Sequence, residues 1–446
     1  MSSTTAQAPE ETVAPPRRLR DYVVGLGPGI VVSMAWLGAG DLVDSSVSGG
    51  NYGYALMWSL ALALFCRFFF VNAIAKYGLC NASGDPSLMA GFRRLWSKLP
   101  LVIGVAAFVN GFILQTYMSV GVGTALFHLT GEIGGNEDWG VFAWTAIAVV
   151  ATALLVGGGK RYRWLEIVAR VAVAVLVVSF VGAAIVSRPA PVEVVRGLAF
   201  ETPANEGLFS TVLVAAAVIG AVGGSAANLM YPEFMRDKGW KGPGFLRLQQ
   251  VDLLVGIVAI IVVDLAVWVV AAQTVRANHL TIDGVNDLAR MMQLAVGGLG
   301  PTLLWLGLFF VTFSSFPAYA TGFTKILFAG VYESVPRRRE RYGEGERDPL
   351  FNWLQVGVMV VVPLVFALPA FPDALTLTVA GSSIGVLLAP FIMGGTIVLT
   401  TAKRFMQPGY ANRWWETVIL LGVFGVGVWA SYGVVRGLVE LALKTM

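Results

Sequence analysis

Long runs of apolar residues recur along the whole chain and restrict its fold more than any other feature. A helix that spans a bilayer needs roughly 20 consecutive apolar residues, and about eleven stretches reach that length. Because a helix satisfies all of its own backbone hydrogen bonds in lipid, we expect an all-helical polytopic membrane protein. The approximate spans are 22–46, 53–76, 100–127, 139–158, 164–186, 208–235, 250–274, 296–331, 350–369, 374–401 and 414–438. The stretch 296–331 is long for one span, so one of its ends is expected to be an amphipathic or surface extension.

Composition excludes several classes of function. Only 13% of the 446 residues are charged, whereas soluble domains carry about 25%. The net charge of +4 is too small to indicate a nucleic-acid partner. The sequence contains no GxxxxGK[ST] or HExxH motif, and we expect neither an enzyme nor an ATP-driven protein, and no cofactor. Residues 1–20 are predicted to form a disordered cytoplasmic tail before a membrane domain over 21–446.

Basic residues alternate between the loops and predict the orientation of the chain. Every second loop is basic, and the intervening loops, such as 131–139, are neutral, mixed or acidic. The basic residues include Arg17, Arg18, Arg20, Arg93, Arg94, Lys98, Lys160, Arg161, Arg236, Lys238, Arg337, Arg341, Lys403 and Arg404. Because positive loops stay inside, the N-terminus is expected in the cytoplasm and Met446 outside. The protein would then be a multi-pass protein of a prokaryotic inner membrane.

The first span is interrupted by Gly38-Ala39-Gly40 and then places Asp41 at membrane depth. A carboxylate near the bilayer centre costs roughly 2.5–3.5 kcal/mol on insertion scales, so it requires a partner. A glycine-broken helix frees backbone carbonyls, and such breaks persist in lipid only where they line a cavity. Asp41 and the carbonyls around Gly38 therefore indicate a site for a hard cation. Asp44 is either a second ligand or vestibule residue, or a polar residue at an outer helix end.

The sixth span repeats this interruption. Its centre, 219–228, reads IGAVGGSAAN, with Gly223-Gly224 in the middle of an apolar run. Two broken spans five apart are typical of two inverted five-helix repeats with a binding site between them. We assign the repeats to about 21–190 and 205–402, with an extra helix at about 414–438. The alternative is that the glycines form a surface for packing between helices.

These residues resemble the Nramp family of divalent-metal transporters, which have the LeuT-type fold of inverted repeats. The stretch from Gly27, GPGIVVSMAWLGAGDLVDS, parallels the family pattern GPxFLVxIxYxDPGNxxTD. The segment 53–58, GYALMW, parallels GYxLLW, and Lys76 with Gly78 occupies the family's Arg-x-Gly. The resemblance extends in span order over nearly the whole chain. It implies a secondary transporter, working by alternating access, whose substrate is a divalent metal ion.

Departures from the family pattern define the predicted site. The family's metal-binding Asp becomes Gly38 and its Asn becomes Asp41, while the Met of its sixth span falls on Gly224 or Ser225, depending on the register. Loss of the soft thioether and the histidine would leave oxygen ligands in a wider cavity. The predicted metal ligands are Asp41, Gly38, Gly224, Ser225 and Asn228, with Asp44 as an added candidate. Such a site suits partly hydrated Mg²⁺, with Mn²⁺ as a second substrate, as in the related prokaryotic magnesium transporters.

Energy coupling is predicted from the missing titratable groups. The family's acids of the third span fall at Tyr117 and Val120, and the polar Gln of the tenth falls at Ser382. We therefore expect flux without protons, driven by the ion gradient and the membrane potential. Two alternatives remain: proton-coupled Mn²⁺ or Fe²⁺ transport, and an amino-acid-type symporter of the same fold. The expected partners are the ion and membrane lipid, and the expected state is a monomer.

Four polar residues lie in spans without an assigned role. Arg67 lies deep in the second span and is expected to pair with an acid or with carbonyls rather than to take part in transport. Asp252, Asp264 and Lys325 are candidates for a polar network whose connections cannot be drawn from the sequence.

Overall fold

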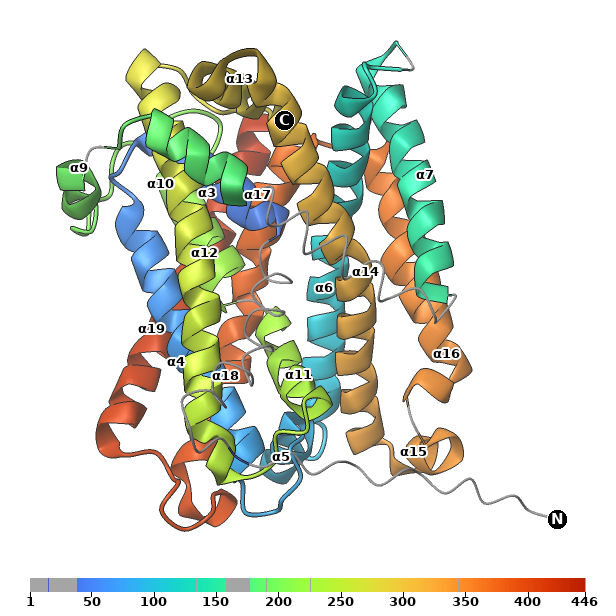
Figure 1. Cartoon of the computed structure of the whole chain (residues 1–446). Coiled ribbons are helices and arrows are strands. Elements are labelled where there is room, and N and C mark those ends of the chain that lie inside the picture. The colour runs from blue at the N-terminus through green and yellow to red at the C-terminus, as the bar shows by residue number, and fades with distance from the viewer. Residues whose placement is uncertain are drawn as a thin grey trace.

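The structure, a computed structural model, describes residues 15, 38–133, 135–157, 177–189, 191–224, 226–343 and 345–445. These residues form a bundle of helices (Figure 1). Most of the predicted span 22–46 and the first half of 164–186 lie outside the described residues. The all-helical architecture predicted from the apolar runs is confirmed for the described part of the chain.

The first half of the chain begins with a short helix that is entirely buried. Helix α3 spans Ala39–Tyr52, and each of its 14 residues is buried. Gly53 has a φ of +60°, which turns the chain before α4. The second span therefore starts at Met57 and not at the predicted residue 53. The remaining elements of this half are α4 (Met57–Cys80), α5 (Leu88–Leu95), α6 (Leu99–Leu129), α7 (Glu137–Gly157), an apolar helix over Val177–Val186 and α9 (Pro191–Arg196).

The second half contains three spans that depart from α-helical geometry. The predicted break in the sixth span is confirmed: α10 (Thr211–Val218) is followed by the π-helical η1 (Ile219–Gly224), the 3₁₀ segment η2 (Ala226–Met230) and α11 (Tyr231–Asp237). The ninth comprises α16 (Pro349–Asn352), η7 (Trp353–Val361) and η8 (Val362–Ala367), and the tenth comprises α17 (Ala374–Gly385), η9 (Val386–Leu388) and α18 (Ala389–Thr401). The regular helices are α12 (Leu246–Thr274), α13 (Val285–Val296), α14 (Gly300–Ser334), α15 (Pro336–Tyr342) and α19 (Trp414–Thr445).

The predicted span 296–331 corresponds to α14 and is preceded by a separate helix. Gly297, with a φ of +74°, ends α13, and α14 starts three residues later. The expectation of an amphipathic extension at one end of this stretch is wrong, because α14 runs as one helix over Gly300–Ser334 and the separate amphipathic helix α13 lies before it. The buried residues of α13 recur on one face: Val285, Leu288, Met291 and Met292.

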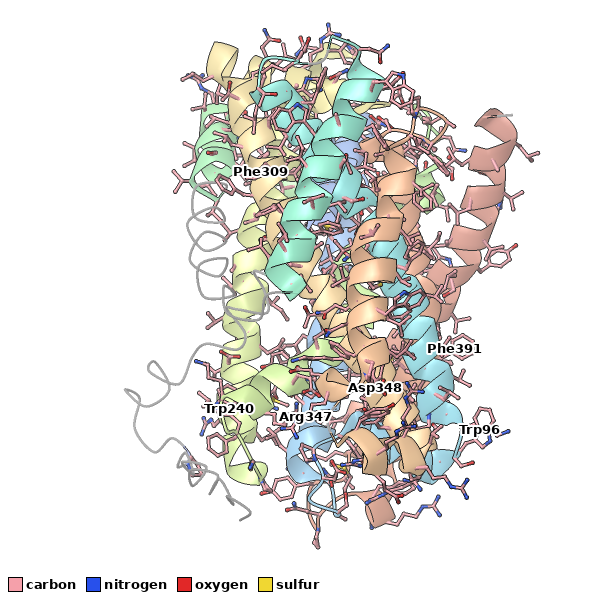
Figure 2. The ribbon with its side chains drawn as sticks, turned by 90° about the vertical axis from the view of Figure 1, so that its right-hand side faces the viewer. Trp96, Trp240, Phe309, Arg347, Asp348 and Phe391 are labelled. Atoms are coloured by element: carbon pink, nitrogen blue, oxygen red, sulfur yellow. The ribbon has the colours of Figure 1, made fainter. Side chains whose placement is uncertain are left out.

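Nine helices in the described part of the chain are long and apolar enough to cross a membrane. Their outward surfaces carry large apolar side chains, which in a soluble protein would be an aggregation hazard. Phe391 on α18 is 70% exposed, and Leu154 on α7 is 71% exposed (Figure 2). Such an apolar surface is stable in contact with the hydrocarbon core of a lipid bilayer, so the chain is a multi-pass membrane protein.

The two ends of the bundle differ in charge. Helices α5 and α15, which contain Arg93, Arg94 and the segment 337–341, lie at one end, and α9 and α13 lie at the other (Figure 1). Trp96, Trp240 and Asp348 also lie at the basic end (Figure 2). Basic segments of the described chain, at α5 and α15, thus lie at the same end, as the predicted topology requires.

An ion pair at this basic end predicts acid sensitivity. The Asp348 carboxylate, 1% exposed, accepts hydrogen bonds from Arg338 Nε at 2.6 Å and Nη2 at 2.9 Å. The Arg338 guanidinium, with help from the Leu350 N–H, holds the pKa of Asp348 below its usual value. The unfolded chain therefore takes up this proton more readily, so the stabilisation is complete above about pH 4 and is lost as pH falls through the lower folded pKa.

We expect Asp348→Asn to lower the melting temperature in detergent at pH 7. The melting temperature of this variant should also fall less than that of the wild-type chain when the pH is lowered below about 4. The control is Glu440→Gln, which removes the exposed Arg436–Glu440 pair of α19 and should change melting little. Equal melting curves for the two variants at pH 7 would contradict a stabilising role for the Arg338–Asp348 pair.

Candidate functional site

Asp41 lies in the first turn of α3, where the chain becomes helical. Gly38 has φ −112° and ψ −177°, an extended conformation that ends any helix at this point. The Gly38 N–H donates to Asp41 Oδ2 at 2.9 Å, while Oδ1 has no hydrogen-bond partner although the side chain is only 3% exposed. A buried carboxylate oxygen without a donor is an open position for a cation.

The irregular part of span 6 faces this helix start. At Gly220, an added Cβ would lie 2.3 Å from the Ser382 carbonyl oxygen, so η1 packs on the backbone of α17. The next residue, Ala221, accepts a hydrogen bond through its carbonyl from Arg67 Nη2 at 2.7 Å. Arg67 is 1% exposed, and its charge also acts on Asp41. The expected pairing of Arg67 with a carbonyl is confirmed.

A small cavity lies between these elements. Its volume is about 20 Å³, enough for about one water molecule. Among the described residues, Asp41 is its one acidic lining residue, and Ser382, Tyr117 and Tyr319 contribute hydroxyl-bearing side chains. The remaining lining residues are Gly38, Gly40, Leu114, Met118, Gly220, Ala221 and Gly385. The cavity therefore joins α3, α6, η1, α14 and α17 around a single carboxylate.

The structure brings together only some of the predicted metal ligands. Gly38 and Asp41 line the cavity, whereas Gly224 and Asn228 are not among its lining residues. Asn228 is buried and donates to the Gly223 carbonyl at 3.3 Å, while its own Oδ1 has no hydrogen-bond partner. Ser225 lies outside the described residues. The roles of Gly224, Ser225 and Asn228 in binding remain predictions.

Asp44 is a residue of the helix interior. Helix α3 continues to Tyr52, and Asp44 is 1% exposed, so its interpretation as a polar residue at an outer helix end is wrong. The Asp44 carboxylate lies close to the side chain of Ser382, and an added Cβ at Gly40 would lie 3.6 Å from Asp44 Oδ2. The alternative role as an added ligand or vestibule residue remains a prediction.

Two cavity residues were missed by sequence reasoning. Met118 of α6 brings a thioether to the lining, so the cavity wall is not made only of oxygen-bearing and small residues as expected. Tyr319 follows Pro317 in α14. Neither residue could be identified from a single sequence, because Met and Tyr are common buried residues of apolar helices. Tyr117 and Ser382 were named only through the family resemblance, and both line the cavity.

The buried polar network around the cavity contains more acids than bases. The charges of Asp41, Asp44 and Asp264 act on one another, and Arg67 interacts with Asp41 and Asp264. The other two candidates for this network lie elsewhere: Asp252 accepts from the Tyr231 hydroxyl at 3.2 Å, and Lys325 pairs with Glu346 at 2.8 Å. In the described part of the chain, no three His, Cys, Asp or Glu side chains are grouped closely enough to share one metal ion.

Comparison with known families places this site in context. The pattern of the Natural resistance-associated macrophage protein-like (Nramp) family matches residues 29–436, which include Asp41, Arg67, Tyr117, Gly220 and Ser382. The chain belongs to the Nramp family. Its membership confirms the resemblance read from Gly27 to Ser45, and it extends that resemblance over most of the sequence.

Relatives and solved structures agree with this assignment. The chain is 22% identical over 307 residues to the "Divalent metal cation transporter MntH" of Bacillus subtilis, covering 67% of this chain and 69% of that protein. It is 24% identical over 299 residues to the MntH of Deinococcus radiodurans, covering 65% and 64%. The fold is similar to a manganese transporter of Eremococcus coleocola (TM-score 0.69, 16% identity, 97% of both chains). It is also similar to MhsT in complex with L-phenylalanine (TM-score 0.53, 14% identity, 93% of this chain and 98% of the other). The LeuT-type fold expected of an Nramp protein is thereby confirmed.

The close packing of η1 on α17 predicts a sensitive glycine. Gly220→Ala would press a methyl group against the Ser382 carbonyl and separate the two elements that flank Asp41. Overpacking costs about 1–3 kcal/mol, so we expect a lower melting temperature and at least about tenfold slower ion uptake. Gly422→Ala on α19 is the matched control, since no atom lies within 4 Å of its added Cβ. Equal uptake by both variants would contradict the importance of this contact.

Proposed function

We propose that this Nramp protein is a secondary transporter that takes up hard divalent cations, Mg²⁺ first and Mn²⁺ second, without moving protons. The observation that carries the proposal is Asp41, a cavity-lining residue in the first turn of α3 whose Oδ1 has no hydrogen-bond partner. Family membership and the names of the relatives support transport of a divalent metal cation. The choice among cations and the mode of coupling follow from the chemistry below.

Charge balance supports a dication as the substrate. A bound cation would favour the ionised form of the buried carboxyl groups of Asp41, Asp44 and Asp264, which would then carry three negative charges against the positive charge of Arg67. Buried charges are costly unless they are compensated. One divalent cation would neutralise the remaining two negative charges, whereas a monovalent ion would leave one.

Ligand chemistry favours Mg²⁺ but leaves room for Mn²⁺. Mg²⁺ keeps several waters and binds through one or two carboxylates, which fits the single acid of the cavity and its hydroxyl-bearing neighbours Ser382, Tyr117 and Tyr319. Met118 is the observation that favours Mn²⁺ as the second candidate, because a thioether suits transition ions better than Mg²⁺.

The third span supports transport without protons. Tyr117 lines the cavity, and Val120 packs with Ala367 and Ala374 in an apolar cluster. A proton path needs titratable groups, and these two positions, where the family pattern has acids, provide no carboxylate. Uptake would be driven by the ion gradient and by the potential, which contributes about 2.3 kcal/mol per charge per 100 mV.

An amino-acid substrate is a weaker alternative. The likeness to MhsT concerns the fold alone at 14% identity. In LeuT-type symporters, broken-helix N-termini hold a substrate carboxylate, and here Asp41 occupies the first turn of α3 and would repel it. The orientation that we propose has the basic end, with α5 and α15, in the cytoplasm of a prokaryotic cell.

Flux measurements with purified protein in liposomes test this function. We expect Mg²⁺ and Mn²⁺ to enter, inside-negative potential to accelerate entry, and a pH dye inside the vesicles to record no acidification. Acidification that follows metal entry would replace this proposal with proton-coupled transport. Uptake of an amino acid without metal flux would support the symporter alternative.

A further inference from the structure

Helix α3 carries a stripe of side-chain oxygens that have no hydrogen-bond partner. Asp41 Oδ1, both Asp44 oxygens, Ser45 Oγ and Ser48 Oγ are all buried and unpartnered. The spacing i, i+3, i+4, i+7 puts these four residues on one face of the helix. By contrast, Ser46 on another face donates to the Leu42 carbonyl at 2.7 Å. The unpartnered oxygens therefore mark one direction and not the helix as a whole.

Helix α12 packs against α3, and the two helices run in the same chain direction. Helix α12 contains another acid whose carboxylate oxygens have no hydrogen-bond partner. At Gly49, an added Cβ would lie 2.5 Å from the Trp268 carbonyl oxygen, and at Gly50 it would approach Val275. Extended by one turn, the contact of Gly49 with Trp268 places Ser45 of α3 at the level of Asp264 of α12. Asp264 is fully buried, and neither of its carboxylate oxygens has a hydrogen-bond partner.

The oxygens of Asp264, Ser45 and Ser48 are distinct from the cavity around Asp41. None of the three residues lines that cavity, and the acids of the network do not form a group of three that could hold one ion together. Asp264 nevertheless interacts electrostatically with Asp41 and Asp44. An ion that leaves Asp41 would therefore still be attracted by Asp264, one step along the stripe.

We propose that Asp264, with the hydroxyls of Ser45 and Ser48, forms a second position for the transported dication between α3 and α12. This inference rests on the proposed function. The two positions share one ion, because two dications together with Arg67 would outweigh the charge of the three carboxyl groups even if all three were ionised. The ligands are hard oxygens, which suit a dication that keeps part of its water shell. The stripe extends from Asp41 toward Tyr52, so this position precedes Asp41 for an ion that enters from outside.

The test uses purified full-length protein and Mn²⁺ alone as the probe, followed by the electron paramagnetic resonance signal of free Mn²⁺. The wild-type chain should bind one ion. Asp41→Asn should still bind one ion, with an affinity at least about a hundredfold weaker, since even outer-shell partners of metal sites contribute about 10- to 100-fold. Adding Asp264→Asn to Asp41→Asn should remove the residual binding. Adding Ser46→Ala instead should leave it unchanged, because Ser46 is satisfied within its own helix.

Three outcomes would overturn the second position. Asp41→Asn could lose all Mn²⁺ binding while the wild-type chain binds it, or the double variant with Asp264→Asn could bind as well as Asp41→Asn alone. Displacement of Mn²⁺ from Asp41→Asn by excess Na⁺ would assign the position to a monovalent ion. A wild-type chain that binds no Mn²⁺ and transports no metal would overturn the proposed function as well, so the two failures are distinguishable. If Asp41→Asn does not fold, the double variant Ser45→Ala/Ser48→Ala should slow Mn²⁺ uptake by about tenfold, and unchanged uptake would refute the position.

Discussion

Replacing Asp41 with asparagine is expected to abolish metal uptake while leaving the fold intact. The asparagine Oδ1 can accept the hydrogen bond from the Gly38 N–H that Asp41 Oδ2 now accepts. Its NH₂ group would then occupy the place of the unpartnered Oδ1 and turn a donor toward the cavity, where a cation needs an acceptor. The loss of the single cavity carboxylate should reduce the rate of Mg²⁺ or Mn²⁺ uptake by more than about a hundredfold.

Uptake into liposomes and the melting temperature in detergent, measured on the same preparations, separate binding from folding. Ser46→Ala is the matched control, because Ser46 lies in the same buried helix and is hydrogen-bonded within it. That variant should retain both uptake and melting temperature. Wild-type uptake by Asp41→Asn would refute Asp41 as the cation ligand, whatever the fold of the protein.

Local chain chemistry made the break in the sixth span predictable, and it predicted the irregular backbone at Gly38 before α3. Glycines in the middle of apolar runs, at Gly38-Ala39-Gly40 and Gly223-Gly224, weaken the helix where they stand, and the structure departs from α-helix at Gly38 and from Ile219 to Met230. The apolar length of each run located most ends of the described spans to within a few residues. Gly53, with a positive φ, delays α4, and Gly297 separates α13 from α14, while α3 and α19 continue past their predicted ends to Tyr52 and Thr445.

Contacts between distant helices were not predictable from one chain. Tyr319 and Met118 reach the cavity because α14 and α6 pack against α3 and α17, and nothing adjacent to them in the sequence signals that neighbourhood. Asp264 was recognised as an unusual acid in a span, but its proximity to Asp41 depends on how α12 lies along α3. Electrostatic networks of this kind are a tertiary property, so composition and periodicity identify their members without connecting them.

Arg67 connects the two halves of the predicted repeat structure. It belongs to α4 in the first half, and it donates to the Ala221 carbonyl of η1 in the second half at 2.7 Å. That carbonyl lies in the irregular part of span 6, where regular α-helical bonding is absent. Arg67 also supplies the one positive charge that acts on both Asp41 and Asp264. Its removal would therefore leave the Ala221 carbonyl without this hydrogen bond and would change the charge balance of the network at the same time.

Arg67→Met is expected to be the most destabilising single substitution of this network. Methionine preserves much of the apolar stem but removes the positive charge that acts on Asp41 and Asp264, and leaving a buried charge uncompensated costs about 3–5 kcal/mol. We expect a strongly lowered melting temperature and little folded protein. Arg436→Met on α19 is the control, because Arg436 is an exposed residue paired with Glu440, and its loss should cost less than about 1 kcal/mol.

A second substitution distinguishes charge balance from loss of the Ala221 contact. Adding Asp264→Asn to Arg67→Met removes one of the three acids and returns the network to the net charge of the wild-type chain. If charge imbalance is the main cost, the double variant should melt above Arg67→Met alone, with a coupling of about 0.5–3 kcal/mol in the double-mutant cycle. If the Ala221 hydrogen bond dominates, the two substitutions should add without coupling, and the electrostatic account of Arg67 would be wrong. A rescued double variant would also give a folded background in which the contribution of Asp41 to Mn²⁺ binding can be measured without Arg67.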